Sequence, residues 1–406
     1  MFNSENLKDQ SLNDLSIALK DNYGIEITKQ GLHERFNNFA LVFLKQALEQ
    51  LLEKQLAIDL SLTAVKAFNR ILIKDSVCFQ IDESLAQHYP GSGGCGSEAA
   101  VRIQFEYDIL SGNINDLSIH GFNDQDSKDS IATMEKTQQG DLIIRDLAYM
   151  NLEALKQFIK RGVFFLCRCH TNVHIYEMED GHYVELNFID ITNYLKKHNI
   201  SVIEKQAYYG KEDKLKVRLI IHLLPEQEIA KRLRTARKNS KKKGPPNLSK
   251  AYKARVALNL FITNANHDQI PTEHVWPLYR LRWQIELIFK IWKSICHIEK
   301  VKKVNIYRFE CYIYSKLIVI VLGWQIIWTI AKQLYHRLAK ALSFYKAFKT
   351  LLRQKIDDLR QVILLRTDTI TDFMTDFYQI SSTNHLLEKR KQQPTSLEIL
   401  LSYVTK

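Results

Sequence analysis

The hydrophobic positions of residues 1 to about 65 recur at helical spacing and predict a helical N-terminal region. Ser11 and Thr28 are placed to cap two helices, and Asn22-Tyr23-Gly24 predicts the turn between them. The apolar residues of these helices are Leu12, Leu15 and Leu19 in the first and Leu32, Phe36, Phe39 and Phe43 in the second. Two short helices joined by a glycine turn are compatible with helix-turn-helix DNA binding, although most such pairs are simply packed helices.

From Ile71 the pattern changes to that of β-strands. Strands are predicted over residues 71–79, 101–107 and 117–119, then a helix near 130–136, a strand ending at Asp146, a helix over 152–160 and a strand over 163–168. A loop marked by Tyr89-Pro90-Gly91 separates the first two strands, and Asn151 is placed to cap the second helix. Three strands, helix, strand, helix and strand is the order of a ribonuclease-H-like core, an α/β fold.

The helix expected to complete that core is delayed by an inserted segment. Residues 171 to about 225 alternate between apolar and polar positions and predict further strands, and a run rich in Lys and Arg follows. Strand character returns over residues 257–264, and the chain after Lys293 is helical almost to its end. The sequence therefore predicts five regions: N-terminal helices (1–65), first part of the core (66–170), β-rich insertion (171–255), second part of the core (256–335) and C-terminal helices (336–406).

The stretch from Tyr279 to Lys293 predicts a single helix, because neither Gly nor Pro interrupts it. Its apolar stripe is formed by Leu281, Ile285, Ile288 and Trp292. Tyr279, Arg282, Glu286 and Lys293 advance by three, four and seven residues, which keeps them close to one line on a helix. A carboxylate flanked by two cations and a phenol suits a site that holds a metal and a phosphate together. The alternative is an amphipathic helix with ordinary Glu and Lys on its wet face.

The composition favours a nucleic-acid partner. The chain of 406 residues has a net charge of +12 and contains 46% hydrophobic and 25% charged residues, which describes a soluble globular protein with an acidic partner, nucleic acid before anionic membrane. The apolar run over residues 317–331 is shorter than a membrane span and predicts a buried helix. The N-terminus has no signal pattern, so a cytoplasmic protein is expected. Six scattered cysteines fit a reducing compartment, and Cys167-Arg168-Cys169-His170 lacks the second ligand pair of a zinc site.

Three acids are candidates for metal-dependent chemistry. Asp75 lies on the first predicted strand and Asp146 ends another, and in a ribonuclease-H-like sheet these two strands are neighbours. With Glu286 they provide hard oxygen donors of the kind that magnesium or manganese prefers. Two such ions about 3.5–4 Å apart activate an attacking water or 3′-hydroxyl and stabilise the leaving oxygen of a phosphoryl transfer. Asp82 and Asp108 compete for the first position, and Asp141 competes for the second.

The spacing of Tyr279, Arg282, Glu286 and Lys293 resembles the signature of one family, the bacterial DDE transposases of the "insertion sequence four" kind. Three more stretches are similar to that family: Lys74-Asp75-Ser76 with the following Tyr89-Pro90-Gly91 loop, Arg145-Asp146-Leu147-Ala148-Tyr149, in which the family usually has Gly at position 148, and Phe165-Leu166-Cys167-Arg168. The similarity runs from about residue 70 to 300. It favours Asp75 over its competitors, because Asp75 keeps the family's distance to the Pro-Gly loop.

The resemblance implies a specific site and partners. Asp75, Asp146 and Glu286 would be catalytic and would bind two divalent ions, Mg²⁺ or Mn²⁺. The phosphate near the cleaved DNA end would be held by Tyr279, Arg282 and Lys293. The implied reaction is cut-and-paste transposition, with 3′-end nicking, a hairpin intermediate and strand transfer to target DNA. The partners would be double-stranded DNA at the terminal inverted repeats and at the target, and a second protomer bound through residues after 336. A bacterial, nucleoid-associated location follows.

Two alternatives remain from the residues alone: a nuclease on the same core that cuts without joining, and a DNA-binding protein with a disabled site. Trp283 and Trp292 are candidates for stacking on an unpaired base, although Trp292 lies on the apolar stripe and favours core packing. The cations of the basic run are Arg234, Arg237, Lys238, Lys241, Lys242 and Lys243, and their expected use is to neutralise DNA phosphates.

Overall fold

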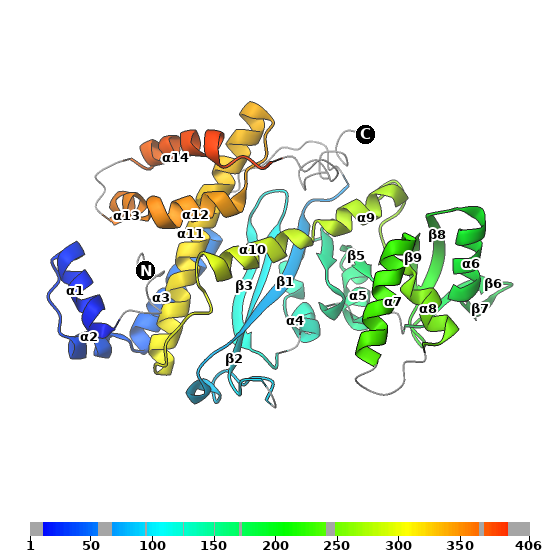
Figure 1. Ribbon diagram of the computed structural model, residues 1–406, viewed down its shortest axis with the longest axis horizontal. Helices are drawn as coiled ribbons and strands as arrows, with labels where there is room; N and C mark the ends of the chain where they lie inside the picture. Colours follow the sequence, from blue (N-terminus) through cyan, green and yellow to red (C-terminus); the bar gives the residue numbers. More distant parts are fainter. Residues whose placement is uncertain are drawn as a thin grey trace. The chain divides into compact units, whose positions relative to one another are not determined.

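The computed structural model describes residues 11–55, 67–93, 96–124, 126–149, 151–169, 173–240, 248–364 and 369–388 (Figure 1). The chain forms two compact units. The first comprises Met1–Thr63, Lys74–Gln125 and Trp283–Leu401, and the second comprises Ala64–Ile73, Asp126–Arg282 and Ser402–Lys406. The five functional regions that the sequence predicts stay a prediction.

The first unit contains a three-stranded part of the sheet, in the order β3-β2-β1. These strands are β1 (Ile71–Gln80, of which residues from 74 belong here), β2 (Ala100–Asp108) and β3 (Ile114–Gly121). β2 and β3 are antiparallel, with Phe105 opposite Leu117 and a bulge at Glu106/Tyr107.

Helices make up the rest of the first unit. They are α1 (Leu12–Tyr23), α2 (Lys29–Arg35), α3 (Asn38–Glu53), α10 (Trp283–Ser294), α11 (Ile306–Leu338), α12 (Phe344–Gln354), α13 (Ile356–Leu364) and α14 (Ile370–Asn384), with a short 3₁₀ turn η2 (Glu83–Leu85). The helical character predicted for both ends is therefore confirmed for the residues described. The predicted caps Ser11 and Thr28 and the turn at Gly24 are also present.

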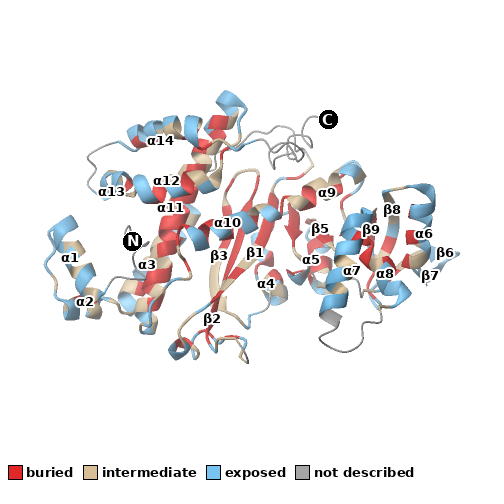
Figure 2. Cartoon of the chain, in the orientation of Figure 1, coloured by how far each residue is buried: buried red, intermediate tan, exposed pale blue. Residues whose placement is uncertain are grey.

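The long helix α11 forms the centre of this unit. Its buried positions follow most of its length (Figure 2), and Trp324 packs against Tyr107 of β2 and donates a hydrogen bond to the Gly112 carbonyl at 2.7 Å. Gly112 has φ +78° and leaves no room for a side chain, because a Cβ there would lie 1.9 Å from the Trp328 indole nitrogen. The length and apolar composition of α11 would suffice for a membrane span, but 61% of its apolar window is buried inside the structure. That burial favours a core helix, as predicted.

Within the second unit the strand order is β1-β4-β5-β10-β9-β8-β6-β7, where β1 contributes its residues up to Ile73. The strands are β4 (Leu142–Arg145), β5 (Phe164–Arg168), β6 (Ile175–Glu179), β7 (His182–Glu185), β8 (Val202–Tyr209), β9 (Leu215–Leu223) and β10 (Leu258–Thr263). β4 and β5 are parallel, whereas β10 is antiparallel to both β5 and β9. The helices are α4 (Asp126–Ala132), α5 (Leu152–Lys160), α6 (Phe188–His198), α7 (Glu226–Ser240), α8 (Lys250–Val256) and α9 (Thr272–Arg280), with 3₁₀ turns η3 (Met134–Lys136) and η4 (Leu147–Tyr149).

The element order β1-β2-β3-α4-β4-α5-β5 confirms the predicted ribonuclease-H-like arrangement. The inserted segment supplies β6 to β9, which continue the sheet beyond β10, but it also contains α6, α7 and α8. The prediction of a mostly β insertion missed these helices. In α6 the buried residues Phe188, Thr192 and Leu195 are spaced by four and three, which is a helical period inside a stretch that also reads as alternating.

One helix predicted near the N-terminus is in fact two. The apolar run from Leu32 to Phe43 is divided between α2 and α3, because the Asn37 side chain accepts a hydrogen bond from the Ala40 amide at 3.1 Å and starts a new helix.

Candidate active site

The predicted single helix over residues 279–293 is broken, and this is a correction. α9 ends at Arg280, and the amides of Leu281 and Arg282 donate to carbonyls only three residues back, at 3.1 Å each. α10 then begins at Trp283, where the second unit gives way to the first. Tyr279 and Arg282 therefore do not share a helix with Glu286 and Lys293.

The break has a packing reason. The Tyr279 ring is buried in the second unit and lies 5.1 Å from the Phe261 ring of β10. In the first unit, α10 buries Ile285, Ile288 and Trp292. Trp292 is 0% exposed, so the prediction of core packing is confirmed, whereas Trp283 is half exposed. The two helices therefore bury their apolar residues in different units.

Asp75 projects from the face of the sheet that α10 covers. Its neighbours on β1 contact the opposite side: Lys74 Nζ lies 2.8 Å from Asp116 of β3, and Ser76 accepts a hydrogen bond from Arg102 of β2 at 3.0 Å. Because side chains alternate along a strand, Asp75 points to the other face, the face of Phe105 on β2. The Phe105 ring lies 5.0 Å from the ring of Trp292.

Glu286 lies on the exposed side of α10, seven residues before Lys293. Lys293 Nζ donates a hydrogen bond to the Cys78 carbonyl of β1 at 3.2 Å. Seven residues of helix and three residues of strand both span about 10 Å. Along α10, Glu286 is therefore about as far from Lys293 as Asp75 is from Cys78 along β1. Both acids belong to the first unit.

Asp146 belongs to the second unit and immediately follows β4. The residue before it, Arg145, is buried, donates to Ser130 Oγ at 2.7 Å and lies over the rings of Tyr149 and Phe158. The Asp146 carbonyl accepts a hydrogen bond from the Tyr149 amide at 3.1 Å, which begins the turn η4. The strand end is thus fixed on both sides of the carboxylate, which is itself partly exposed.

Tyr279 lies within reach of several charges in the second unit. Burial raises the pKa of its hydroxyl to about 12, while Arg282 lowers it, Asp146 raises it and Arg168 lowers it by smaller amounts. The hydroxyl consequently stays protonated at neutral pH and keeps a hydrogen to donate. The structure therefore brings together Tyr279, Arg282 and Asp146, and it adds Arg168 at the end of β5.

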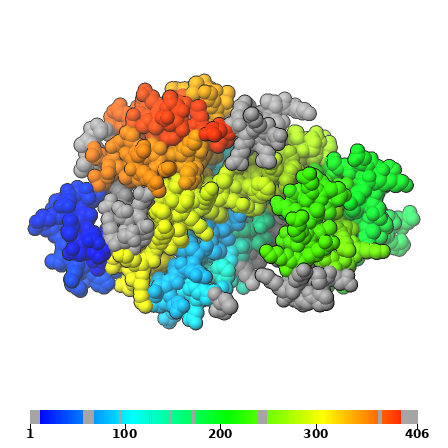
Figure 3. Space-filling view, in the orientation of Figure 1, coloured from blue at the N-terminus to red at the C-terminus, as the bar shows by residue number. Residues whose placement is uncertain are grey.

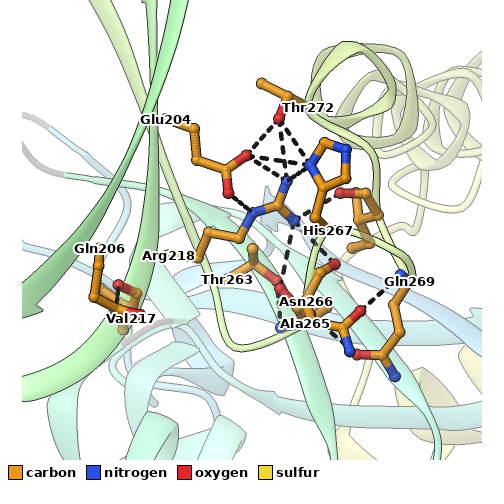
Figure 4. Close-up of polar contacts among 11 residues, drawn as sticks. Glu204, Gln206, Val217, Arg218, Thr263, Ala265, Asn266, His267, Gln269 and Thr272 are labelled. Carbon is orange, nitrogen blue, oxygen red and sulfur yellow. Dashed lines mark hydrogen bonds and ion pairs between the residues drawn. The ribbon is translucent and has the colours of Figure 1, made fainter.

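The loop before α9 is held by a buried arginine of the insertion (Figure 4). Arg218 of β9 donates to both carboxylate oxygens of Glu204 on β8, at 2.6 and 2.7 Å. Its Nη1 donates to the carbonyls of Asn266 and Ile270 at 3.1 and 2.6 Å, and Glu204 also accepts from the hydroxyl of Thr272, the first residue of α9. The insertion thereby fixes the start of the helix that carries Tyr279.

Sequence reasoning missed Arg168, Glu204 and Arg218 as contributors to this region. The available signal was a charged residue inside an apolar strand run, such as Arg218 between Val217 and Leu219, since a buried charge requires a partner. The partners of Arg218 lie 14 residues before it and about 50 residues after it, so its role was not visible from local spacing.

The competing aspartates have structural partners. Asp82 accepts from the Ser84 amide and hydroxyl, which lowers its pKa, and Asp108 accepts from the amides of Leu110 and Ser111. Asp141 is buried and pairs with Arg70 at 2.6 Å. These contacts are typical of turns and strand ends.

The donor chemistry of Asp75, Asp146 and Glu286 fits a hard divalent cation, because all three are carboxylates with solvent access. Within the described ranges, no three His, Cys, Asp or Glu side chains are gathered in a group that could hold a metal ion. Of the predicted basic run, Arg234, Arg237 and Lys238 are exposed on α7, and Lys241–Lys243 lie outside the described residues.

Comparison with known proteins identifies the family. Residues 66–322 match the family described as "Transposase DDE domain". The chain is 32% identical over 392 residues to the transposase for insertion sequence element IS231F of Bacillus thuringiensis subsp. israelensis, covering 93% of this chain and 81% of that protein. It is 31% identical over 413 residues to the IS231E transposase of Bacillus thuringiensis subsp. finitimus (98% and 86% covered), and 30% identical over 344 residues to the IS1151 transposase of Clostridium perfringens (81% and 72% covered). The chain therefore belongs to the DDE transposases of the insertion sequence four family, enzymes that cleave and transfer DNA strands.

Proposed function

We propose that this transposase performs cut-and-paste transposition of its insertion sequence, with Asp75, Asp146 and Glu286 as the ligands of two divalent ions, Mg²⁺ or Mn²⁺. The observation that carries this assignment is the projection of Asp75 from the sheet face covered by α10, the helix of Glu286. The ions, when bound, would polarise the phosphate and activate the attacking hydroxyl. The structural roles of Asp82, Asp108 and Asp141 support the choice of Asp75 and Asp146.

Three further residues are proposed to bind the DNA phosphate beside these acids. Arg282 presents a planar guanidinium that suits two phosphate oxygens, and Lys293 supplies a point charge. Tyr279 donates one hydrogen bond from its hydroxyl, whose pKa burial raises to about 12. Tyr279 and Arg282 lie close to Asp146 in the second unit, which supports a phosphate-binding role for them beside a metal-binding carboxylate.

The proposed partners are double-stranded DNA at the terminal inverted repeats and at the target, and a second protomer that binds the other end. The N-terminal helices α1 to α3 are the proposed end-binding region, and residues after 336 are the proposed dimer contact. The proposed sequence of steps is 3′-end nicking, hairpin formation at the excised end and strand transfer, in the bacterial cytoplasm at the nucleoid.

The test is a cleavage and strand-transfer assay in magnesium on a duplex that carries the element's own end. Asp75→Asn, Asp146→Asn and Glu286→Gln should each lose nicked and joined products, by at least about 10³-fold, because a metal ligand is removed. Asp82→Asn is the matched control and should keep both products. Nicked DNA without joined product in the wild type would favour a nuclease, and tight binding without cutting would favour a DNA-binding protein. Activity retained by all three variants would overturn the site assignment.

A further inference from the structure

A groove of about 320 Å³ opens in the C-terminal part of the first unit, between α12 and the end of α14. Both helices reach the molecular surface, in orange and red in Figure 3. The groove is lined by Tyr345, Lys346, Lys349, Thr350, Arg353, Gln354, Asn384 and His385. Three of these side chains are cations and none is a carboxylate, so the groove suits an anion.

Two of the cations, Lys349 and Arg353, form a row with Tyr345 because of the way α12 packs. The helix buries Ala347, Phe348, Leu351 and Leu352 on one side. On the other side Tyr345, Lys349 and Arg353 follow at intervals of four residues, and all three are exposed. Eight residues of helix place the ends of this row about 12 Å apart. The basic row is therefore a linear feature of the surface.

The opposite wall of the groove is fixed to α12. The Ser343 amide donates to the His385 carbonyl at 2.7 Å, and the Leu387 amide donates to the Ala341 carbonyl at 2.9 Å. The His385 ring is buried and lies 2.9 Å from Thr350 Oγ1 and 3.0 Å from Ser381 Oγ. Burial and the charge of Lys346 lower the pKa of His385, so the positive charge of the groove comes from its Lys and Arg side chains.

The row continues onto the helix that carries Glu286. Lys290 Nζ lies over the Tyr345 ring, 6.0 Å from its centre, and Lys290 is exposed one helical turn after Glu286. Lys290, Tyr345, Lys349 and Arg353 therefore form one track that begins beside that acid. Lys346 flanks the track, and its Nζ lies 3.2 Å from the carboxylate of the highly exposed Glu388. This surface ion pair is weak, so Glu388 competes only weakly with an anion for Lys346.

We propose that this track binds the phosphodiester backbone of a DNA strand that leads away from Glu286. Each strand of a duplex carries one phosphate per ~3.4 Å of helix axis, so a 12 Å row spans about three successive phosphates. Tyr345 and the amides of Gln354 and Asn384 add hydrogen-bond donors at the edges of the groove. The proposal that the strand leads away from the catalytic site rests on the proposed role of Glu286. The proposed contact between the track and DNA does not depend on that role.

The test is DNA binding by the full chain without divalent metal, measured by fluorescence anisotropy over a range of salt concentrations. Lys349→Gln/Arg353→Gln should weaken binding by about tenfold or more and reduce the slope of log affinity against log salt by about 1.8, since each phosphate contact contributes about 0.9. The charge-preserving Lys349→Arg/Arg353→Lys should retain most of the affinity. The matched control is Lys156→Gln/Lys196→Gln, which removes one partly exposed and one exposed cation that already pair with Asp213 and Glu226, and it should leave the slope unchanged.

Three results would overturn the proposal. The first is an unchanged slope in Lys349→Gln/Arg353→Gln. The second is a loss of dimer, in a light-scattering measurement, with unchanged DNA affinity, which would assign this face to the dimer contact proposed above and not to DNA. The third is competition by inorganic phosphate at constant ionic strength, which would indicate a free-phosphate site. Because no cleavage is measured, failure here is distinguishable from failure of the proposed catalytic site.

Discussion

Arg218 and Glu204 form a two-point ion pair, with nitrogen–oxygen distances of 2.6 and 2.7 Å, between neighbouring strands of the inserted segment. The remaining guanidinium nitrogen of Arg218 donates to carbonyls of the loop between β10 and α9. The insertion is therefore more than an extension of the sheet. It holds the loop that starts the helix of Tyr279.

Loss of the Arg218 guanidinium should destabilise the protein. Arg218→Met leaves the Glu204 carboxylate without its cation and the Ile270 carbonyl without the Arg218 donor, and Arg218 is only 9% exposed. We expect the free energy of unfolding to fall by about 3 kcal/mol, measured by urea denaturation. The control is Lys205→Met, which breaks the more exposed pair with Glu177 on the same sheet and should cost less than about 1 kcal/mol. Equal effects of the two substitutions would contradict the role assigned to Arg218.

The same pair predicts a pH dependence. Hydrogen bonds from Arg218, the largest cause, and from Thr272 lower the pKa of Glu204 to about 2, against a burial effect in the opposite direction. Because the folded-state pKa lies below the ordinary value of 4.5, the stabilisation is complete above about pH 4.5 and is lost as the pH falls toward 2. The free energy of unfolding of wild type relative to Glu204→Gln should decrease by on the order of 2 kcal/mol over that range. A constant difference between pH 5 and 2.5 would show that Glu204 is not held in this way.

The buried Lys316, beside the end of α10, predicts that the free energy of unfolding changes at alkaline pH. Lys316 is 1% exposed, donates to the carbonyls of His297 and Lys300 at 2.6 and 2.9 Å, and has a pKa lowered to about 8 by burial. The unfolded chain, with the ordinary pKa of 10.5, binds more protons between pH 8 and 10.5, so folding becomes more favourable as pH rises through this window. The stability of wild type relative to Lys316→Met should increase by about 2 kcal/mol between pH 7.5 and 10. A decrease would mean that the ammonium form is the one that the fold favours.

The buried Lys74–Asp116 pair should show strong coupling. Both side chains are almost fully buried and lie 2.8 Å apart, and Lys74 immediately precedes Asp75 on β1. Removing one partner alone, in Lys74→Met or Asp116→Leu, should cost about 3–5 kcal/mol, because the other charge is left buried. The double variant Lys74→Met/Asp116→Leu should recover much of that loss in thermal unfolding. Additive losses in the double variant would argue against a direct pair.

Much of the fold was predictable because it depends on local pattern. The apolar run from Ile71 predicts the strand β1. The position of Asn151 predicts the capping hydrogen bond with which α5 begins. The break at Leu281 and Arg282 was not predictable in this way. No Gly or Pro marks it, and it arises because Tyr279 and Trp292 are buried in different units.

The candidate site also combines residues that local sequence predicts with residues whose roles depend on distant contacts. Asp75, Asp146 and Glu286 stand out through their spacing and chemistry, but the residues that fix their surroundings are distant in sequence. Arg218 contacts Ile270, 52 residues later, and the groove joins Tyr345 to His385. Such pairs become visible only when the chain is folded.

The most direct test of the central claim measures metal binding. Manganese bound to the wild-type protein on its DNA end is measured by the loss of the free-ion electron paramagnetic resonance signal. If Asp75, Asp146 and Glu286 are the metal ligands, then Asp75→Asn, Asp146→Asn and Glu286→Gln should each weaken binding by about tenfold or more, while Asp82→Asn binds like the wild type. Unchanged manganese binding in all three variants would contradict the assignment of these carboxylates.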